Sequence, residues 1–229
     1  MKQKINLLFL FVLLFAAAGL YAQDSTQSWD NQMYLGNKIS FGEGTMKHSL
    51  ELQTRFRNNL QSMDNWYIEY VTSHLISENF EIVPDLRFTV KPTKLELRPG
   101  IGVLYKYFND RLQFVNQVKY QFDWATKGEN GHAFREVVFL NKRINEKIVL
   151  TTVAGFIYRW WPSWNGFQYI RVGPGISYKL DKNIGVNFSY FVGVENRKTN
   201  WLWAGIPLIQ VVINVSKTYK YTPAYYFSF

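Results

Sequence analysis

The chain has 229 residues, no cysteine, 18% aromatic residues and a formal net charge of +9. The lack of cysteine excludes a disulfide scaffold, a thiolate nucleophile, a cysteine zinc site and a lipidated N-terminal cysteine. A mean hydropathy of -0.19 argues against a bundle of membrane helices but fits a barrel wall, which averages an apolar and a polar face.

The first 22 residues have the features of a secretory signal peptide. Lys2 and Lys4 precede an apolar run from Ile5 to Phe15, and small residues lead to an expected cleavage after Ala22. An uncleaved helical anchor is the alternative, but the small residues before the cleavage point and the polar residues after it favour removal. We therefore expect residues 1–22 to be a signal peptide and residues 23–229 to form one exported β-barrel domain.

The rest of the chain is a succession of segments in which apolar and polar residues alternate, the pattern of β-strands with two unlike faces. The segments cover 29–41, 47–57, 66–71, 80–90, 95–107, 112–124, 134–140, 148–159, 169–179, 186–194 and 201–215, and the tail 217–229 alternates again. No helical pattern lies between them, and Pro84 suggests a bulge or an irregular edge in the fourth. The sequence predicts an all-β fold, a single transmembrane antiparallel barrel with short turns.

The number of strands is either twelve or ten. Twelve strands place both termini at one rim, yet the longer connections 58–65, 125–133 and 161–166 lie at that same rim, and barrels usually turn their longer loops outward from the cell. Omission of the first segment and the tail gives ten strands and reverses the assignment. We expect twelve, with ten as the alternative.

The central hairpin, 95–124, has the clearest alternation. Pairing Tyr107 with Leu112 across the turn places Ile101 opposite Val118 and keeps every apolar residue on one face. A run of about 13 residues extends roughly 43 Å and, tilted by ~45°, rises about 30 Å, the hydrocarbon thickness of a bilayer. Soluble strands are usually about half as long.

Tryptophan and the terminal residue support a membrane location. All eight tryptophans fall at one end of the predicted strands, as in an aromatic girdle at a membrane interface. Packing under loops is the alternative explanation. The predicted interface residues include Trp66, Trp124, Trp160, Trp161, Trp201 and Trp203. The chain also ends on Phe229 with aromatic residues two and four positions earlier, which is similar to the assembly signal of outer-membrane barrels.

Charged residues occupy the opposite face of the predicted strands. They are Glu51, Arg55, Arg57, Glu69, Glu81, Arg87, Glu96, Arg98, Lys119, Asp123, Arg135, Arg159, Arg171 and Lys179. In a soluble barrel this would be the wet outer face, whereas in a membrane barrel these residues face the lumen and pair across it. Gly100, Gly102, Gly173 and Gly175 share that face and would leave room for long side chains, so we expect a narrow lumen filled largely by its own side chains.

The chain resembles an uncharacterised family of outer-membrane barrels catalogued as domain of unknown function 2490. The resemblance lies in Trp29, the strand ELQTRFR with Glu51, Arg55 and Arg57, the segment Arg171-Val172-Gly173-Pro174-Gly175, and the terminal phenylalanine. It implies an outer-membrane barrel over most of the mature chain and supplies no catalytic residues. The tail after Ser216 departs from the family pattern, in which the last apolar strand ends the chain.

The leading functional hypothesis is a non-enzymatic protein of a Gram-negative outer membrane, either a structural or accessory subunit or a narrow pore. Arginines 55, 57, 98, 159 and 171 would bias such a pore toward anions. A soluble periplasmic barrel that carries an apolar ligand is the alternative. A lipid-acting enzyme is disfavoured because adjacent His48 and Ser49 point to opposite faces, and His74 and His132 are expected at a strand end and in a loop.

The expected partners are outer-membrane lipids, the barrel assembly machinery and a larger membrane complex. No nucleic-acid partner is expected, because lysine and arginine stand singly at alternate strand positions. No cofactor or metal is expected. Glu96 and Asp123 face each other in the central hairpin and could hold a cation, but Arg98 is the expected partner of both.

Overall fold

The computed structural model describes residues 29–196, 200–215 and 218–225, and every regular element in these ranges is a β-strand. The strands are β1 (Trp29–Asn31), β2 (Met33–Gly44), β3 (Met46–Arg57), β4 (Ser62–Leu75), β5 (Phe80–Lys91), β6 (Lys94–Asn109), β7 (Leu112–Ala125), β8 (Gly131–Arg143), β9 (Ile148–Trp161), β10 (Trp164–Lys179), β11 (Ile184–Asn196), β12 (Trp201–Asn214) and β13 (Thr218–Tyr219). The predicted signal peptide and Phe229 lie outside the described residues.

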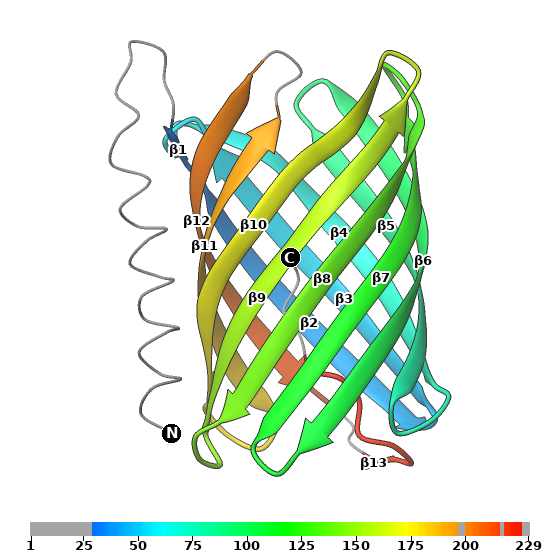
Figure 1. Ribbon diagram of the computed structural model, residues 1–229, viewed down its shortest axis with the longest axis vertical. Coiled ribbons are helices and arrows are strands. Elements are labelled where there is room, and N and C mark those ends of the chain that lie inside the picture. The colour runs from blue at the N-terminus through cyan, green and yellow to red at the C-terminus, as the bar shows by residue number, and fades with distance from the viewer. Residues whose placement is uncertain (1–28, 197–199, 216–217, 226–229) are drawn as a thin grey trace.

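Strands β2 to β12 form one closed barrel in which each strand pairs antiparallel with the next (Figure 1). The barrel closes through a parallel pairing between β2 and β12. Strand β1 continues the same register along β12, and Gln32 N–H donates to Gly205 O at 2.9 Å between the two segments. Thus β1 and β2 act as one wall strand, and the wall has eleven strands.

The observed number falls within the predicted range of ten to twelve, but the favoured number of twelve is wrong. The tail does not supply a wall strand, because its only paired segment is the two-residue β13 beside the end of β2. An odd number of strands makes the first and last parallel, so the wall begins at one rim and ends at the other. A wall of ten or twelve strands would begin and end at the same rim, so neither predicted number fits the observed wall. The described connections between wall strands at the two rims have similar lengths, one to five residues.

The two faces of the wall differ sharply in polarity. Outward-facing Ile101, Val103 and Tyr107 are 56%, 51% and 53% exposed, whereas inward-facing Lys106 and Lys119 are 0% and 2% exposed. A closed sheet with apolar side chains outside and charged side chains inside is a transmembrane barrel, since a soluble barrel would have the reverse polarity. The alternative of a soluble carrier with an apolar interior is therefore wrong. Within the described ranges, no helix has the length and apolar content needed to cross a membrane.

The central hairpin is paired two residues away from the predicted register. Asn109 pairs with Leu112 around the tight turn at Asp110 and Arg111, so Tyr107 lies opposite Phe114. Asp110 adopts a φ of 37°, a left-handed conformation that Asp tolerates better than most residues. A shift of two residues preserves the faces, so each side chain of the hairpin stays on the face that the alternation assigns to it although the partners differ.

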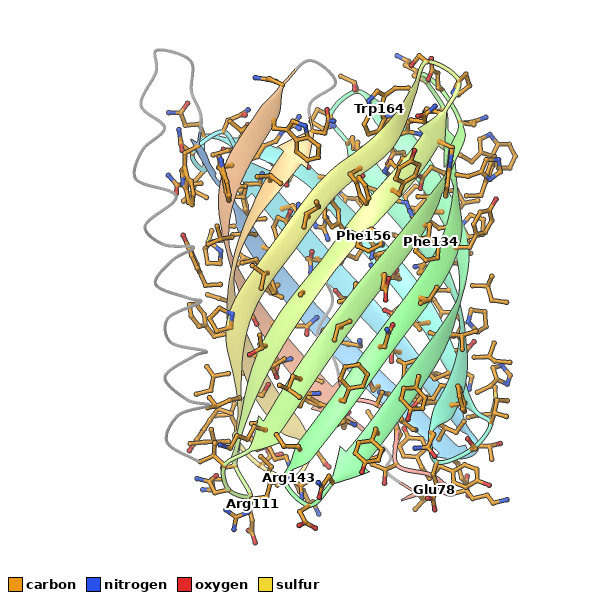
Figure 2. The ribbon with its side chains drawn as sticks, in the orientation of Figure 1. Glu78, Arg111, Phe134, Arg143, Phe156 and Trp164 are labelled. Atoms are coloured by element: carbon orange, nitrogen blue, oxygen red, sulfur yellow. The ribbon has the colours of Figure 1, made fainter. Side chains whose placement is uncertain are left out.

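The eight tryptophans lie at one end of the wall. Trp29, Trp164 and Trp201 begin strands at that end, and Trp124 and Trp161 are at or next to the ends of strands that finish there. Figure 2 shows Trp164 at this rim and Glu78, Arg111 and Arg143 at the opposite rim. We call the two ends the tryptophan rim and the opposite rim.

Candidate functional site

A cavity opens inside the barrel at the tryptophan rim, and we call it the rim cup. Its volume is about 400 Å³, and its lining comes from strands all around the wall. The lining includes the rim residues Arg57, Lys91 and Trp161 and the deeper residues Tyr34 and Arg87. Each wall strand from β2 to β11 supplies at least one residue to the lining.

The rim cup carries a large excess of positive charge. Eight cationic side chains line it, and they are Arg55, Arg57, Arg87, Lys91, Arg98, Arg135, Arg159 and Arg171. Only three carboxylates line it, those of Asp64, Glu96 and Glu195. Even if Glu69 and Asp123, which pair with lining arginines just outside the lining set, are added, the cations remain three in excess. A concave site with one dominant charge attracts ions of the opposite sign.

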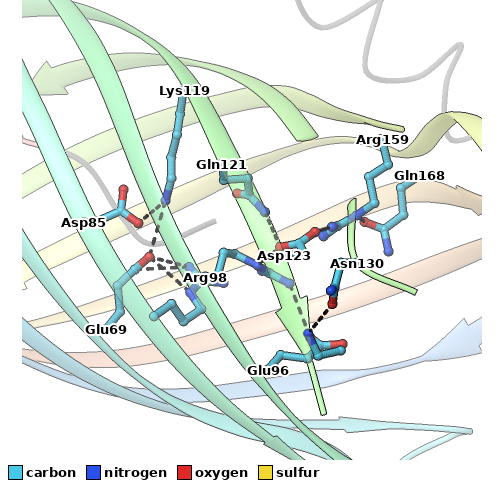
Figure 3. A network of polar contacts seen from close by, with 12 residues as sticks. Glu69, Asp85, Glu96, Arg98, Lys119, Gln121, Asp123, Asn130, Arg159 and Gln168 are labelled. Carbon is cyan, nitrogen blue, oxygen red and sulfur yellow. Dashed lines mark hydrogen bonds and ion pairs between the residues drawn. The ribbon is translucent and has the colours of Figure 1, made fainter. Parts of the chain in front are cut away.

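A buried ion-pair network lies below the cup. Arg87 binds the Glu69 carboxylate through two hydrogen bonds of 3.1 Å, one to each oxygen. Lys119 reaches across from β7 to Asp85 at 2.5 Å and to Glu69 at 3.6 Å (Figure 3). All four side chains are at least nine-tenths buried. Removal of Glu69 would take the carboxylate from Arg87, and removal of Lys119 would take the cation from Asp85, at a cost of about 3–5 kcal/mol in each case.

A second network joins β6, β7 and β9 at the cup itself. Arg98 forms an ion pair with Asp123 and contacts Glu96 at 3.5 Å, which confirms the predicted role of Arg98 as the partner of both. Asp123 also pairs with Arg159 (Figure 3). Glu96 additionally receives Lys91 at 2.9 Å. The two carboxylates are therefore occupied by cationic side chains of the protein.

Glycine on the inner face provides the space that this network needs. A Cβ atom at Gly100 would lie 2.5 Å from Cε of Lys119 and 3.0 Å from Oδ1 of Asp85. Such contacts are too short for any larger residue unless the Lys119–Asp85 pair moves. The predicted function of Gly100, to make room for long side chains opposite, is confirmed.

A cluster of buried apolar side chains lies inside the barrel next to the cup, and we call it the apolar layer. It consists of Val83, Leu104, Val115, Val137, Phe139, Val153, Phe191, Ala204, Ile206 and Leu208, with Tyr34 beside it. Among these, Leu104, Val115 and Val153 have no exposed surface. Ala224 of the C-terminal tail packs into the same cluster and is 2% exposed. The layer and the described part of the tail therefore pack against each other inside the barrel.

The tail is held inside the lumen by polar contacts to the wall. Lys106 Nζ donates to Thr222 O at 2.5 Å and to Glu81 at 2.7 Å, and Glu81 in turn accepts from the Ala224 N–H at 2.7 Å. Tyr225 O accepts from Asn141 Nδ2 at 2.8 Å. The Tyr225 hydroxyl contacts Ser177 and donates to Asn187 at 2.8 Å. These contacts come from β5, β6, β8, β10 and β11, so the tail is anchored around much of the circumference.

The structure places most of the predicted lumen charges on the inner face. Glu51, Glu69, Glu81, Arg87, Glu96, Lys119, Asp123, Arg159 and Arg171 are buried, and Arg55, Arg98 and Arg135 are partly buried. Arg57 is exposed at the mouth of the cup, where it pairs with Asp64 at 3.0 Å. The prediction that Lys179 faces the lumen is wrong, because Lys179 lies exposed at the end of β10.

The predicted interface aromatics divide into two groups. Trp124, Trp160 and Trp201 are 59%, 44% and 48% exposed on the outer face, and Trp66 and Trp203 are half-buried there. The prediction that Trp161 faces the membrane interface is wrong. Trp161 turns inward and lines the cup, and its ring centre lies 5.2 Å from the guanidinium carbon of Arg159. The reason is its position, one residue past Trp160 in an alternating strand.

Sequence reasoning missed the tyrosines of the cup. Tyr34, Tyr67 and Tyr169 lie under guanidinium groups. The sequence does indicate their position, because each tyrosine stands at an alternate strand position that otherwise carries polar or charged residues. The histidines lie elsewhere: His48 contacts the Tyr70 hydroxyl at 2.8 Å and His132 contacts Tyr120, in both cases on the exposed face. Among the described residues, no acidic or histidine cluster has the grouping of a metal site.

Comparisons with known proteins give one family match over part of the chain and several distant structural matches. The family described as "Putative MetA-pathway of phenol degradation" matches residues 91–204, whereas the resemblance to domain of unknown function 2490 is not confirmed. The solved structures that are similar include the NanC porin, with 8% identity, a TM-score of 0.47, and coverage of 70% of this chain and 86% of that chain. The KdgM porin in complex with disordered oligogalacturonate has 15% identity, a TM-score of 0.43, and coverage of 76% and 93%.

A second structure of the KdgM porin has 15% identity and a TM-score of 0.41, with coverage of 72% of this chain and 90% of that chain. No curated protein matches this chain. The identities and TM-scores are too low to transfer a ligand or an activity.

Proposed function

We propose that the protein is a non-enzymatic barrel of a Gram-negative outer membrane that acts as a narrow, anion-biased pore held closed by its own C-terminal tail. The observation that carries the proposal is the position of the tail inside the lumen. A tail hydrogen-bonded to six wall strands, β5, β6, β7, β8, β10 and β11, through its backbone and side chains is a specific fit. The wall around it has the polarity of a membrane-spanning barrel.

The outer-membrane location rests on three features that act together. Transmembrane barrels of this kind belong to outer membranes. Residues 1–22 have the pattern of an export signal. Outward-facing Trp124, Trp160 and Trp201 at one rim suit the membrane interface, where the indole ring is in apolar surroundings and its N–H is wet. In the proposal, outer-membrane lipids surround the wall and the assembly machinery reads Phe229.

The anion bias follows from the rim cup. Solutes that enter from the tryptophan rim meet eight cationic and three acidic side chains. A ring of cationic side chains in a low-dielectric wall favours anions and repels cations. Arg55, Arg98, Arg159 and Arg171, four of the five arginines predicted to bias conduction, lie on the cup surface together with Arg57 at its mouth.

A structural or accessory subunit is the second candidate, and the apolar layer favours it. Leu104, Val115 and Val153 belong to the wall rather than to the tail, so they stay in the lumen when the tail leaves it. Ions can pass only if these side chains move as well. If the layer stays shut, the barrel has no pore, and its role is structural.

Conductance of the protein refolded into planar bilayers tests the proposal without the cellular assembly machinery. The full chain should be silent, and a chain that ends at Val215 should give anion-selective steps. Lys220→Ala is the matched control, because Lys220 donates to Gly44 only through its backbone N–H, which alanine retains. Heat-modifiable gel mobility must show that each variant is folded. A folded, truncated barrel that stays silent would eliminate the pore and leave the structural role.

The double variant Lys106→Met/Glu81→Gln provides a second route that keeps the whole chain. It removes the Nζ–Thr222 bond and the buried charge pair together. The proposal expects brief openings from this variant, with the same anion preference as the truncated chain.

A further inference from the structure

Arginine and tyrosine alternate in space across the rim cup. The guanidinium carbon of Arg55 lies 4.3 Å from the ring centre of Tyr34 and 5.1 Å from that of Tyr67. The Tyr34 ring is shared with Arg171 at 5.6 Å, and the Tyr67 ring with Arg87 at 4.0 Å. The row Arg87–Tyr67–Arg55–Tyr34–Arg171 therefore crosses strands that are far apart in the sequence, from β5 through β2 to β10.

This row holds like charges close together before any solute arrives. Each guanidinium over a ring is attracted by the negative face of the aromatic system, which offsets part of the repulsion between neighbouring cations. The carboxylate of Glu69 neutralises Arg87, and that of Glu195 pairs with Arg171. Among the residues that the structure describes, no carboxylate lies within ion-pair distance of Arg55, whose Nε donates to the neutral Gln53 at 2.7 Å.

Several buried donors of the cup have no acceptor among the described groups. They are Nη2 of Arg55, Nε of Arg171, Nε1 of Trp161 and the hydroxyl of Thr89. The side chain of Arg171 is only 5% exposed. These four groups come from β3, β10, β9 and β5, and all four residues line the same cavity. A buried donor without an acceptor is unfavourable, so the site is arranged for a group that accepts hydrogen bonds.

We propose that the rim cup binds a small hydroxylated solute that carries a carboxylate, such as a sugar acid. The carboxylate accepts from the guanidiniums of Arg55 and Arg171, whose planar donors match the two oxygens of such a group. Two neutral amides that also line the cup, those of Asn65 and Gln168, each use one end in a contact with the protein, and the other end can exchange hydrogen bonds with hydroxyl groups.

The cup does not favour an aromatic acid. The rings of Tyr34, Tyr67, Tyr169 and Trp161 each have a guanidinium over them, at 4.3, 4.0, 4.1 and 5.2 Å. The rings are therefore already used to hold arginines. A volume of about 400 Å³ is within the range of small-molecule sites and accommodates a hydroxylated ring.

Binding to the closed, full-length barrel tests this site independently of conduction. Isothermal titration of the protein folded in detergent micelles would use three probes: glucuronate, glucose and inorganic phosphate. Glucuronate and glucose share a ring and differ by one carboxylate. The proposal expects saturable binding of glucuronate, weakened by added salt, with no detectable heat from glucose. Equal affinity for glucose and glucuronate, or no binding of either, overturns it. Phosphate that binds as tightly as glucuronate overturns the assignment to a hydroxylated carboxylate.

Substitution of Arg55 gives the sharpest variant, because its removal leaves no carboxylate of the protein without a partner. Arg55→Gln should weaken glucuronate binding about tenfold or more, the range for loss of one charge-assisted hydrogen bond. Arg143→Gln at the opposite rim is the matched control and should bind like the parent. Heat-modifiable mobility confirms that both variants are folded. An Arg55→Gln barrel that is folded and binds with parental affinity contradicts the site, and this outcome says nothing about whether the tail closes a pore.

Discussion

The Lys106–Glu81 pair under the tail offers the strongest stability prediction. Lys106 Nζ and the Glu81 carboxylate lie 2.7 Å apart, and their side chains are 0% and 1% exposed. Lys106→Met would remove the charge, the ion pair and the hydrogen bond to Thr222 O. Glu81 would keep only the Ala224 N–H as a hydrogen-bond donor among the contacts described above. Loss of one partner from a buried pair costs about 3–5 kcal/mol.

Removal of both charges should cost much less than removal of either one. In the double variant Lys106→Met/Glu81→Gln no buried charge is left unpaired, and replacement of a whole buried pair is often close to neutral. The four proteins of this cycle would be unfolded in urea from lipid vesicles, with tryptophan fluorescence as the signal. We expect a favourable coupling of roughly 2 kcal/mol or more. Additive single effects, or a Lys106→Met cost below about 1 kcal/mol, would refute the reasoning.

Three further predictions use the same unfolding measurement. Gly100→Val should destabilise the barrel by about 1–3 kcal/mol, because the new side chain displaces the Lys119–Asp85 pair, whereas Gly185→Ala, with its nearest atom at 3.4 Å, should be nearly silent. Asp123→Asn should cost about 3–5 kcal/mol, because two arginines lose their shared carboxylate; a loss below 1 kcal/mol would show that solvent screens the site. Arginine in place of outward-facing Ile101 should cost about 2–4 kcal/mol, and arginine at the rim position Leu112 about 0–1 kcal/mol; equal costs would be inconsistent with a lipid-facing wall.

Strand polarity was predictable from the sequence because each strand lies between two different environments. Alternation identified the outward set that contains Ile101 and Val103 and the inward set that contains Lys119 and Arg98. A side-chain period of two tolerates errors of two residues in register, so the misplaced Tyr107–Leu112 pairing did not change the faces. The partnership of Arg98 with Glu96 and Asp123 was predictable for the same reason, since all three share one face of one hairpin.

The closure of the barrel and of its lumen could not be predicted in this way. The alternation of the tail is the same whether it extends the wall or enters the lumen, and only tertiary contacts such as those of Ala224 and Tyr225 decide between the two. Leu104 and Val115 occupy the polar register of the central hairpin. Apolar residues at these two inward-facing positions are the one feature of the sequence that indicates an apolar layer in the lumen. The predicted count of twelve strands is wrong because the tail packs inside the barrel and adds no strand to the wall.

The direction in which the apolar face points is the claim on which the rest depends, and spin labels measure it directly. The chain has no cysteine, so single cysteines at positions 101 to 105 can carry a nitroxide without further engineering. In vesicles, collision with oxygen, which concentrates in lipid, should peak at 101, 103 and 105 and fall at 102 and 104. Maxima at 102 and 104 instead, or equal values along the strand, would contradict a wall whose apolar side faces lipid.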